Sequence, residues 1–206
     1  LRSKVEIEDF SSDYVVGVLS PEKFKEIQLE NNKLTDTILY RESRLFIDPR
    51  KKELGTRMLS SLEKLHLTIK KLNLKIVDSS IYFELAHSLG VPEKGLSNLK
   101  EQLFGLEANF EELNAIDFKK GCYVGQENTA RMKLKNKIRK KLLAVTIDGN
   151  IEVGEDLKFG EIKIGKILID KPHSFALVKL FDPDFSDFKD KELDCGKVKV
   201  RIINSY

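Results

Sequence analysis

The feature that most constrains the fold is a series of short strand-like segments after Lys141. Apolar and polar residues alternate within them, and the turn-like sequences Asp148-Gly149-Asn150 and Lys158-Phe159-Gly160 separate them. The expected strands are Leu142–Ile147, Glu161–Ile169, Phe175–Leu180 and Val198–Ile203. Closely spaced short strands are typical of a small antiparallel barrel or sandwich. We therefore expect a β domain over residues 137–206, with a domain boundary near Asn136.

The preceding residues, 1–136, mix helix and strand signals. Alternation or β-favouring composition predicts strands at Val5–Glu8, Tyr14–Leu19, Thr37–Arg41 and Arg44–Ile47. One helix is predicted to begin at Pro21, with Ser20 as its N-cap. A second is predicted over Ser79–Leu89, ending at Gly90. The segment Leu59–Ile69 fits either a short amphipathic helix or extended strands.

The composition narrows the class of protein. The 206 residues are 41% hydrophobic and 33% charged, which is ordinary for a folded domain. A net charge of +3 does not single out nucleic acid as a partner, and no apolar run reaches membrane-spanning length, so no membrane partner is expected. The two cysteines, Cys122 and Cys195, are too few for a disulfide framework and indicate a reducing compartment. Cys195 is expected in a turn before a strand.

The segment Lys119–Arg131 reads K-K-G-C-Y-V-G-Q-E-N-T-A-R and has the composition of a site. Gly121 and Gly125 favour a sharp loop that presents Cys122, and the residues that follow suit the first turns of a helix. A helix N-terminus and nearby cations both lower the pKa of a thiol. The alternative is that Cys122 is a small buried side chain. A single cysteine without a neighbouring ligand does not indicate a metal site.

Several segments resemble the YgfZ family, the folate-binding relatives of the glycine-cleavage T protein that assist iron–sulfur enzymes. The glycine–cysteine segment fills every fixed position of the family signature K-G-C-Y-x-G-Q-E-x-x-x-R. Further matching segments are D-P-R with L-G-T-R in residues 48–57, L-G-V-P-E in 89–93 and L-E-A-N-F in 106–110. The chain departs from the family at Gly105, which replaces a proline, and near Ala86 and His87, where an arginine is usual. The resemblance implies an α+β fold, in which a T-protein-like mixed α/β folate-binding domain precedes a small antiparallel β-barrel.

The resemblance also implies roles for individual residues. Cys122 would be the chemically active thiol, and Lys120 and Arg131 would supply charge that favours its thiolate. The residues expected to shape the loop and form hydrogen bonds around it are Tyr123, Gln126 and Glu127. The implied cofactor is tetrahydrofolate or a derivative, and Glu107 would face the pterin, because a carboxylate can accept two hydrogen bonds from an aminopyrimidine edge. Glu107 fits equally well as the acid at the start of a helix over Ala108–Leu113.

One matched region and one histidine have simpler interpretations as well. The D-P-R segment favours a surface turn with a salt bridge over a catalytic role. His87 is expected to be a packed or surface residue rather than a catalytic base.

Residues 131–141 carry seven basic side chains: Arg131, Lys133, Lys135, Lys137, Arg139, Lys140 and Lys141. A charge run of this kind usually forms a solvated face. The functional alternatives are attraction of a polyglutamylated folate tail or of RNA phosphates. No aromatic residues interleave the lysines, so the run does not indicate sequence-specific RNA recognition.

The function implied by the resemblance is that of a folate-dependent accessory protein for assembly or repair of iron–sulfur enzymes. Its expected partners are folate and iron–sulfur client or assembly proteins. The alternatives are a tetrahydrofolate-dependent aminomethyltransferase-type enzyme and a tRNA-associated factor that uses the basic run. The family's chain would also include a front segment before Leu1. The expected compartment is the bacterial cytoplasm, with the mitochondrial matrix as the alternative.

Overall fold

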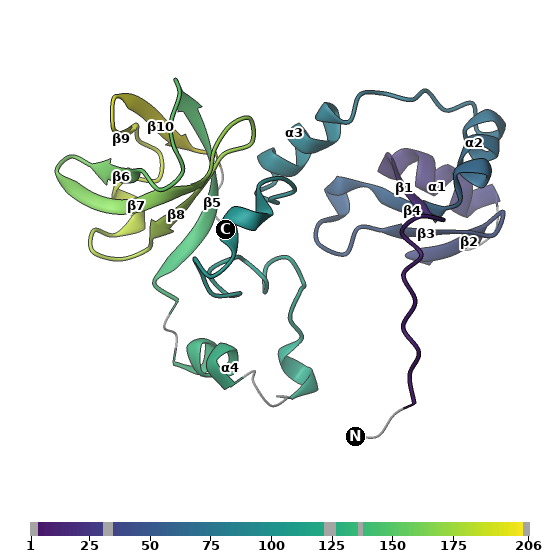
Figure 1. The fold of residues 1–206 in the computed structure, drawn as a ribbon, viewed down its shortest axis with the longest axis horizontal. Coiled ribbons are helices and arrows are strands. Elements are labelled where there is room, and N and C mark those ends of the chain that lie inside the picture. Colours follow the sequence, from purple (N-terminus) through teal and green to yellow (C-terminus); the bar gives the residue numbers. More distant parts are fainter. Residues whose placement is uncertain (1–3, 31–34, 122–126, 136–137, 204–206) are drawn as a thin grey trace. The chain divides into compact units, whose positions relative to one another are not determined.

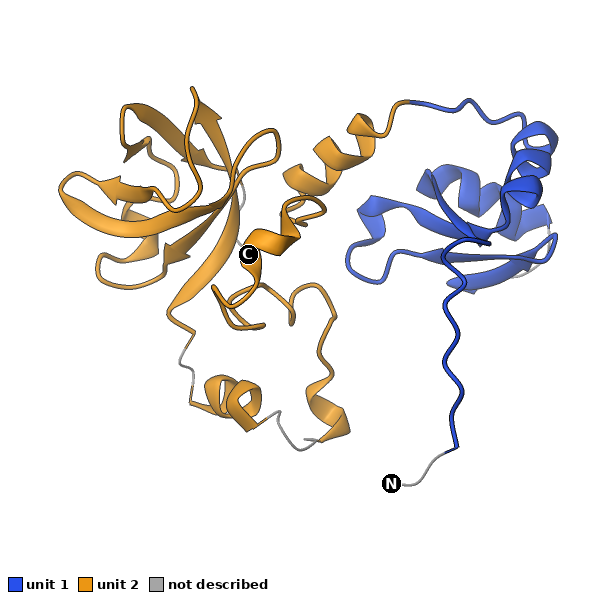
Figure 2. Cartoon of the chain, viewed as in Figure 1, with its two compact units in different colours: residues 1–77 blue, residues 78–206 orange. Residues whose placement is uncertain are grey.

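The computed structural model describes residues 4–30, 35–121, 127–135 and 138–203. They form two compact units, residues 1–77 and residues 78–206 (Figure 2). The domain boundary predicted near residue 136 lies outside the described residues. No helix among the described residues combines the length and the apolar character needed to cross a membrane.

In its described residues, the first unit is a four-stranded antiparallel sheet with two α-helices and one short 3-10 helix (Figure 1). Its strands, in the spatial order β1-β4-β3-β2, are β1 (Val15–Leu19), β4 (Thr56–Ser60), β3 (Ser43–Ile47) and β2 (Thr37–Tyr40). The helices are α1 (Pro21–Glu30), α2 (Leu62–Lys71) and the short 3-10 helix η1 (Lys52–Leu54). Both α-helices pack on one face of the sheet, where Phe24 and Ile27 of α1 meet Leu45 and Met58.

Local sequence explains where these helices begin. The Ser20 hydroxyl accepts a hydrogen bond from the Lys23 backbone N–H at 3.3 Å, as expected for an N-cap before Pro21. Ser61 caps α2 in the same way, through the Lys64 N–H at 3.4 Å. The ambiguous segment Leu59–Ile69 is therefore the end of a strand followed by a capped helix.

One expected strand of this unit is absent from the described residues. Val5–Glu8 forms no strand and is exposed, with Ile7 91% accessible. Alternation gives a segment the pattern of a strand, but a strand also needs a neighbouring strand for its backbone hydrogen bonds. Residues 4–10 have no such neighbour in the part of the chain that the structure describes.

The second unit contains a closed antiparallel barrel with the strand order β10-β5-β8-β7-β6-β9. The strands are β5 (Lys140–Asp148), β6 (Asp156–Phe159), β7 (Ile162–Ile169), β8 (Phe175–Lys179), β9 (Leu193–Cys195) and β10 (Val198–Ile202). The four barrel strands predicted from alternation are confirmed. β6 and β9 were not predicted: Lys158 and Phe159 lie in a strand rather than a turn. Cys195 ends β9 and does not lie in the turn before β10.

β5 and β8 are buried on both faces. Leu143 and Ala176 point into the barrel core, whereas the alternate residues Leu142 and Leu177 point outward into a second cluster. Leu99 and Leu103 pack against that outer cluster. The segment after residue 95 therefore covers one side of the barrel, and this packing brings the turn at Glu107 beside β5.

The second unit also contains α3 (Ser80–Ser88), α4 (Glu127–Leu134) and the 3-10 helices η2 (Leu96–Leu99), η3 (Phe118–Lys120) and η4 (Phe185–Asp187). The predictions of α3 and of a helix behind the glycine–cysteine segment are confirmed. The helix predicted over Ala108–Leu113 is wrong, because these residues form successive turns. Asn109 has a φ of 61°, in the left-handed region, which interrupts a right-handed helix.

Candidate pocket between α4 and β5

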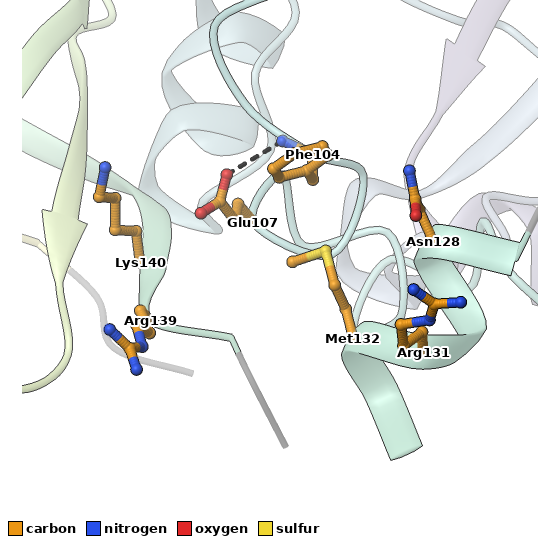
Figure 3. Close-up of a pocket in the computed structure, with 7 residues that line it drawn as sticks. All are labelled: Phe104, Glu107, Asn128, Arg131, Met132, Arg139 and Lys140. Atoms are coloured by element: carbon orange, nitrogen blue, oxygen red, sulfur yellow. Dashed lines mark hydrogen bonds between the residues drawn. The ribbon is translucent and has the colours of Figure 1, made fainter. Parts of the chain in front are cut away.

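The turn at Glu107 is held by hydrogen bonds to Phe104. The Phe104 carbonyl accepts from the backbone N–H groups of Glu107 and Ala108, at 2.9 and 3.0 Å. In return, Oε2 of Glu107 accepts from the Phe104 N–H at 3.0 Å (Figure 3). This reciprocal arrangement resembles a helix capping box, although no regular helix follows. Glu107 thus caps a turn rather than a helix, and its second oxygen, Oε1, accepts no hydrogen bond from the described residues. Its contact with a pterin stays a prediction.

Two hydrogen bonds fasten this turn to β5. The Leu142 N–H donates to the Glu107 carbonyl at 2.8 Å, and the Asn109 side-chain amide donates to the Leu142 carbonyl at 2.6 Å. Asn109 is only 1% exposed, so the second bond is shielded from water. The pairing of β10 with β5 begins at Val145, so the Glu107 turn serves as the neighbour of β5 in the stretch before it.

A cavity of about 440 Å³ lies where the turn, α4 and the start of β5 meet (Figure 3). Its lining residues are Phe104, Glu107, Asn128, Arg131, Met132, Arg139 and Lys140. Phe104 is 58% exposed. The Met132 side chain extends from α4 towards the turn that carries Phe104. The cavity thus combines an accessible aromatic ring and a carboxylate with three cationic side chains.

The other basic residues of the run differ in their surroundings. Lys133 forms an ion pair with Glu111 at 2.5 Å, and Lys141 forms one with Glu112. Lys141 is largely buried; burial lowers the pKa of its ammonium group, and the charge of Glu111 opposes that shift. In contrast, no carboxylate among the described residues pairs with Arg131, Arg139 or Lys140.

The structure describes the segment that precedes Cys122 as far as Gly121. The Asp117 carboxylate caps η3 by accepting from the Lys119 N–H at 2.8 Å, and the Lys120 Nζ contacts the Gly121 carbonyl at 3.4 Å. Gly121 has a φ of 84°, and a Cβ at this position would meet nothing within 4 Å. Glycine is therefore needed here for the backbone conformation rather than for space, as the sequence predicted.

The structure brings only some of the predicted site residues together. Glu107 and Arg131 line one cavity, whereas Lys120 and Glu127 do not line it. Cys122, Tyr123 and Gln126 lie outside the described residues, so their roles stay predictions. The lining residues that sequence reasoning did not assign to a site are Phe104, Asn128, Met132, Arg139 and Lys140. The basic run in the sequence could have pointed to two of them, Arg139 and Lys140. Their place beside the Glu107 turn depends on long-range packing, which the sequence pattern does not reveal.

Elsewhere, the D-P-R segment forms a buried ion cluster. Asp48 is 1% exposed and accepts hydrogen bonds from Arg50 Nη2 at 2.9 Å and from Arg57 Nε at 2.8 Å. Burial alone would raise the pKa of Asp48, but the hydrogen bonds from Arg50 and Arg57 outweigh it and lower that pKa to about 2. The predicted salt bridge is confirmed, and its carboxylate is buried rather than on the surface.

The structure also describes the two remaining residues that the sequence singled out. His87 packs against Phe175 with ring centroids 5.3 Å apart, and its Nε2 lies 2.9 Å from the Ser174 carbonyl oxygen, so the expectation of a packed histidine is confirmed. Cys195 is fully buried in the barrel core. Burial, together with the charges of Glu155 and Asp156, raises the pKa of this thiol to about 11.

The fold of this chain is T-protein-like. It resembles the crystal structure of the glycine cleavage system aminomethyltransferase T from Bartonella henselae, with a TM-score of 0.56 and 12% sequence identity. The match covers 87% of this chain and 55% of that one. The predicted fold class, a T-protein-like α+β fold with an antiparallel barrel, is confirmed. No protein-family model matches the chain.

Sequence comparison adds a more specific similarity. The chain is 30% identical over 152 residues to the mitochondrial iron–sulfur cluster assembly factor IBA57 homologue of Dictyostelium discoideum, a match that covers 71% of this chain and 36% of that protein. It is 32% identical over 152 residues to mouse IBA57, covering 72% and 40% of the two chains. It is 34% identical over 148 residues to human IBA57, covering 70% and 39%. The chain thus spans well under half the length of these curated relatives, whose similarity supports the family indicated by the motifs.

Proposed function

We propose that this chain belongs to the YgfZ family of folate-binding accessory proteins and supports the assembly or repair of iron–sulfur enzymes. The similarity to proteins described as iron–sulfur cluster assembly factors, in an amoeba, mouse and human, supports this role. Its partners would be iron–sulfur client or assembly proteins. Because those relatives are described as mitochondrial, we propose the mitochondrial matrix rather than the bacterial cytoplasm as the compartment.

The observation that carries the folate proposal is that Oε1 of Glu107, which accepts no hydrogen bond from the described residues, lies in the same cavity as the exposed ring of Phe104. The flat pterin ring fits against an aromatic ring, and its aminopyrimidine edge donates hydrogen bonds that Oε1 of Glu107 can accept. A cavity of about 440 Å³ is of the size that small-molecule sites have. When bound, a reduced folate supplies one-carbon or redox chemistry.

Cys122 is the proposed reactive thiol. The left-handed Gly121 precedes it, and α4 begins at Glu127, so a helix N-terminus opens close to it in the chain. A helix N-terminus favours a thiolate, and Lys120 and Arg131 would add cationic charge. Tyr123, Gln126 and Glu127 are proposed to shape this loop and to form hydrogen bonds around the thiol or the folate.

Folate titration of the Glu107→Gln variant tests the cofactor proposal. A carboxylate hydrogen bond to a ligand is worth about 1.5–3 kcal/mol, so we expect affinity for tetrahydrofolate to fall about tenfold or more. Glu161→Gln is the matched control, because it removes the same charge from an exposed barrel residue that does not line the cavity. Equal affinity of Glu107→Gln and wild type would overturn the assignment of Glu107.

The iron–sulfur role needs a cellular test. In cells that lack the protein, the activity of iron–sulfur enzymes is expected to fall while mitochondrial enzymes without clusters keep theirs. Wild-type protein should restore the activity, and Cys122→Ser should not if the thiol takes part. Full restoration by Cys122→Ser at matched protein levels would remove the thiol from the proposal and leave the folate site unaffected.

A second candidate function is a tetrahydrofolate-dependent aminomethyltransferase-type enzyme, which the T-protein-like fold favours. The two candidates differ in their products. An enzyme of this type forms methylene-tetrahydrofolate from an aminomethyl donor, whereas an accessory protein binds folate without that turnover. Sustained formation of methylene-tetrahydrofolate by the purified protein would favour the enzyme.

A further inference from the structure

A pair of histidines joins α3 to the loop between β7 and β8. His87, near the end of α3, and His173, in the loop, have ring centroids 5.5 Å apart. Phe83 lies one turn earlier on α3, with its ring centroid 6.1 Å from that of His173, and the ring centroid of Phe175 lies 5.3 Å from that of His87. These four rings therefore form one of the contacts that hold α3 on the barrel.

The two imidazole rings differ in their hydrogen bonds. Nε2 of His87 lies 2.9 Å from the Ser174 carbonyl oxygen, and because a carbonyl can only accept, this nitrogen carries a proton. Nδ1 of His173 is buried and has no hydrogen-bond partner among the described residues. A neutral ring can leave this nitrogen as a bare acceptor. A protonated ring would instead bury a charged N–H donor without an acceptor, which costs much more free energy.

The charged groups around His173 also disfavour its protonation. α3 contributes His87 and Glu84, and the segment after α3 contributes Lys94, whose Nζ lies 4.0 Å from the centroid of the Phe83 ring. Desolvation, followed by the charges of His87 and Lys94, lowers the pKa of His173 from its ordinary value, and the charge of Glu84 opposes that shift. The surroundings of this ring therefore suit its neutral form.

We propose that His173 is a pH-sensitive contact, which holds α3 on the barrel while its ring is neutral and releases α3 when the ring takes up a proton. The inference does not depend on the proposed folate site. Because the packed ring favours the neutral form, the stability that this contact gives is complete above the ordinary imidazole pKa of about 6.5. It is lost progressively as pH falls below that value, so acid should open α3 before it opens the barrel.

Native-state hydrogen exchange of the whole chain tests this contact. The amides of β10 serve as the internal reference, because β10 pairs with β5 and β9 and carries none of the four rings. A released imidazole with a pKa of about 6.5 is about nine-tenths protonated at pH 5.5. After correction for the intrinsic exchange rate, the opening of α3 should therefore increase by up to about tenfold between pH 7.5 and pH 5.5. An increase in α3 no larger than that in β10 would overturn the proposal.

Two variants assign the effect to one histidine. His173→Phe keeps an aromatic ring for the contacts with Phe83 and His87 but cannot take up a proton, so the opening of α3 should lose most of its pH dependence. His66→Phe is the matched control, because it makes the same change at an exposed residue of α2 in the other unit. In this control, α3 should respond to acid as in wild type. If His173→Phe keeps the wild-type pH dependence, the assignment to His173 is wrong.

An NMR titration of the imidazole signals gives a second measurement that does not depend on the folding of His173→Phe. The chain has three histidines, so His173→Gln identifies the signal of His173 by removing it. In the wild-type protein this ring should titrate below its ordinary pKa of about 6.5, and the amide signals of α3 should shift with the same midpoint. A ring that titrates at its ordinary pKa while α3 stays protected from exchange would overturn the proposal.

Discussion

The side-chain amide of Asn109 donates a hydrogen bond to the carbonyl oxygen of Leu142 at 2.6 Å. This contact joins a turn to a barrel strand that lies far along the chain, and it does so from a residue with left-handed backbone geometry. Asparagine tolerates that geometry better than most residues, and its amide replaces the hydrogen bond that a neighbouring strand would supply. Asn109 therefore helps to hold Glu107 beside β5, together with the hydrogen bond from the Leu142 N–H to the Glu107 carbonyl.

Replacing Asn109 by alanine should destabilise the second unit. A buried carbonyl that loses its hydrogen bond costs about 1–3 kcal/mol, and the left-handed backbone adds about 1 kcal/mol. We expect a loss of about 2–4 kcal/mol in the free energy of unfolding, with weaker folate binding in the molecules that remain folded. Asn114→Ala is the control, because Asn114 also has a positive φ, 55°, but is exposed. Equal losses in the two variants would show that the bond to Leu142 contributes nothing.

The Asp48 ion cluster should make the first unit sensitive to acid. Because the pKa of Asp48 is lowered to about 2 in the folded chain, its ionised form stabilises the fold above its ordinary pKa of about 3.9, and this contribution is lost as pH falls through about 2. A shift of this size corresponds to about 2 kcal/mol. Asp48→Asn should therefore increase hydrogen exchange in β3 and β4 at pH 7, with a difference from wild type that disappears towards pH 2.

Exposed Asp36 provides the comparison within the same unit. Asp36→Asn should leave the exchange of β3 and β4 within error of wild type at pH 7. If Asp48→Asn behaves in the same way, the ion cluster contributes no net stability.

The two cysteines should differ sharply in reactivity. Cys195 is fully buried and its pKa is raised to about 11, so it should resist iodoacetamide at pH 7.5 until the barrel unfolds. In a Cys195→Ala background, alkylation of Cys122 should follow a pKa below the free-cysteine value of about 8.5, and tetrahydrofolate should slow the reaction. Slow alkylation of Cys122 that folate does not affect would make it a packing residue.

Gly165 should be essential for closing the barrel. A Cβ there would collide with the carbonyl oxygen of Leu177 and lie 3.2 Å from the Cα of Val178, both on the neighbouring strand β8. Gly165→Ala should therefore destabilise the barrel by more than about 2 kcal/mol, because strand backbones cannot move apart locally without losing hydrogen bonds.

Substitution of Gly154 shows how much of the loss at a glycine comes from backbone strain alone, without a steric clash. It has a φ of +99°, but a Cβ there would meet nothing within 4 Å. Gly154→Ala should cost only the backbone strain, about 1–2 kcal/mol. A thermal unfolding midpoint that falls as much for Gly154→Ala as for Gly165→Ala would contradict the steric explanation.

The sequence predicted those elements whose signals are local. α1 follows from the Ser20 cap and Pro21, and the longer barrel strands follow from alternation. β6 and β9 were not predicted, because four-residue and three-residue strands carry too little pattern and exist through their barrel neighbours. The exposed segment Val5–Glu8 shows the converse, since alternation without a neighbouring strand does not produce a strand.

The candidate site was predictable only in part for the same reason. Glu107 and Arg131 stood out through a family resemblance that supplied chemical roles. Arg139 and Lys140 stood in a basic run that most often forms a solvated surface. Their place in the cavity depends on the bonds from the Glu107 turn to Leu142, and no local pattern encodes such a contact.

The closed barrel leaves the two units with different tendencies to associate. Each barrel strand has a strand on both sides, whereas β1, at the end of the other sheet, has one strand neighbour among the described residues. β1 reads V-V-G-V-L, without charge or proline, and its Val16 side chain is 56% exposed. Unprotected edges of this kind pair readily with other chains. When the units are produced separately, residues 78–206 should therefore tolerate high concentration, and residues 1–77 should need solubilising substitutions on β1.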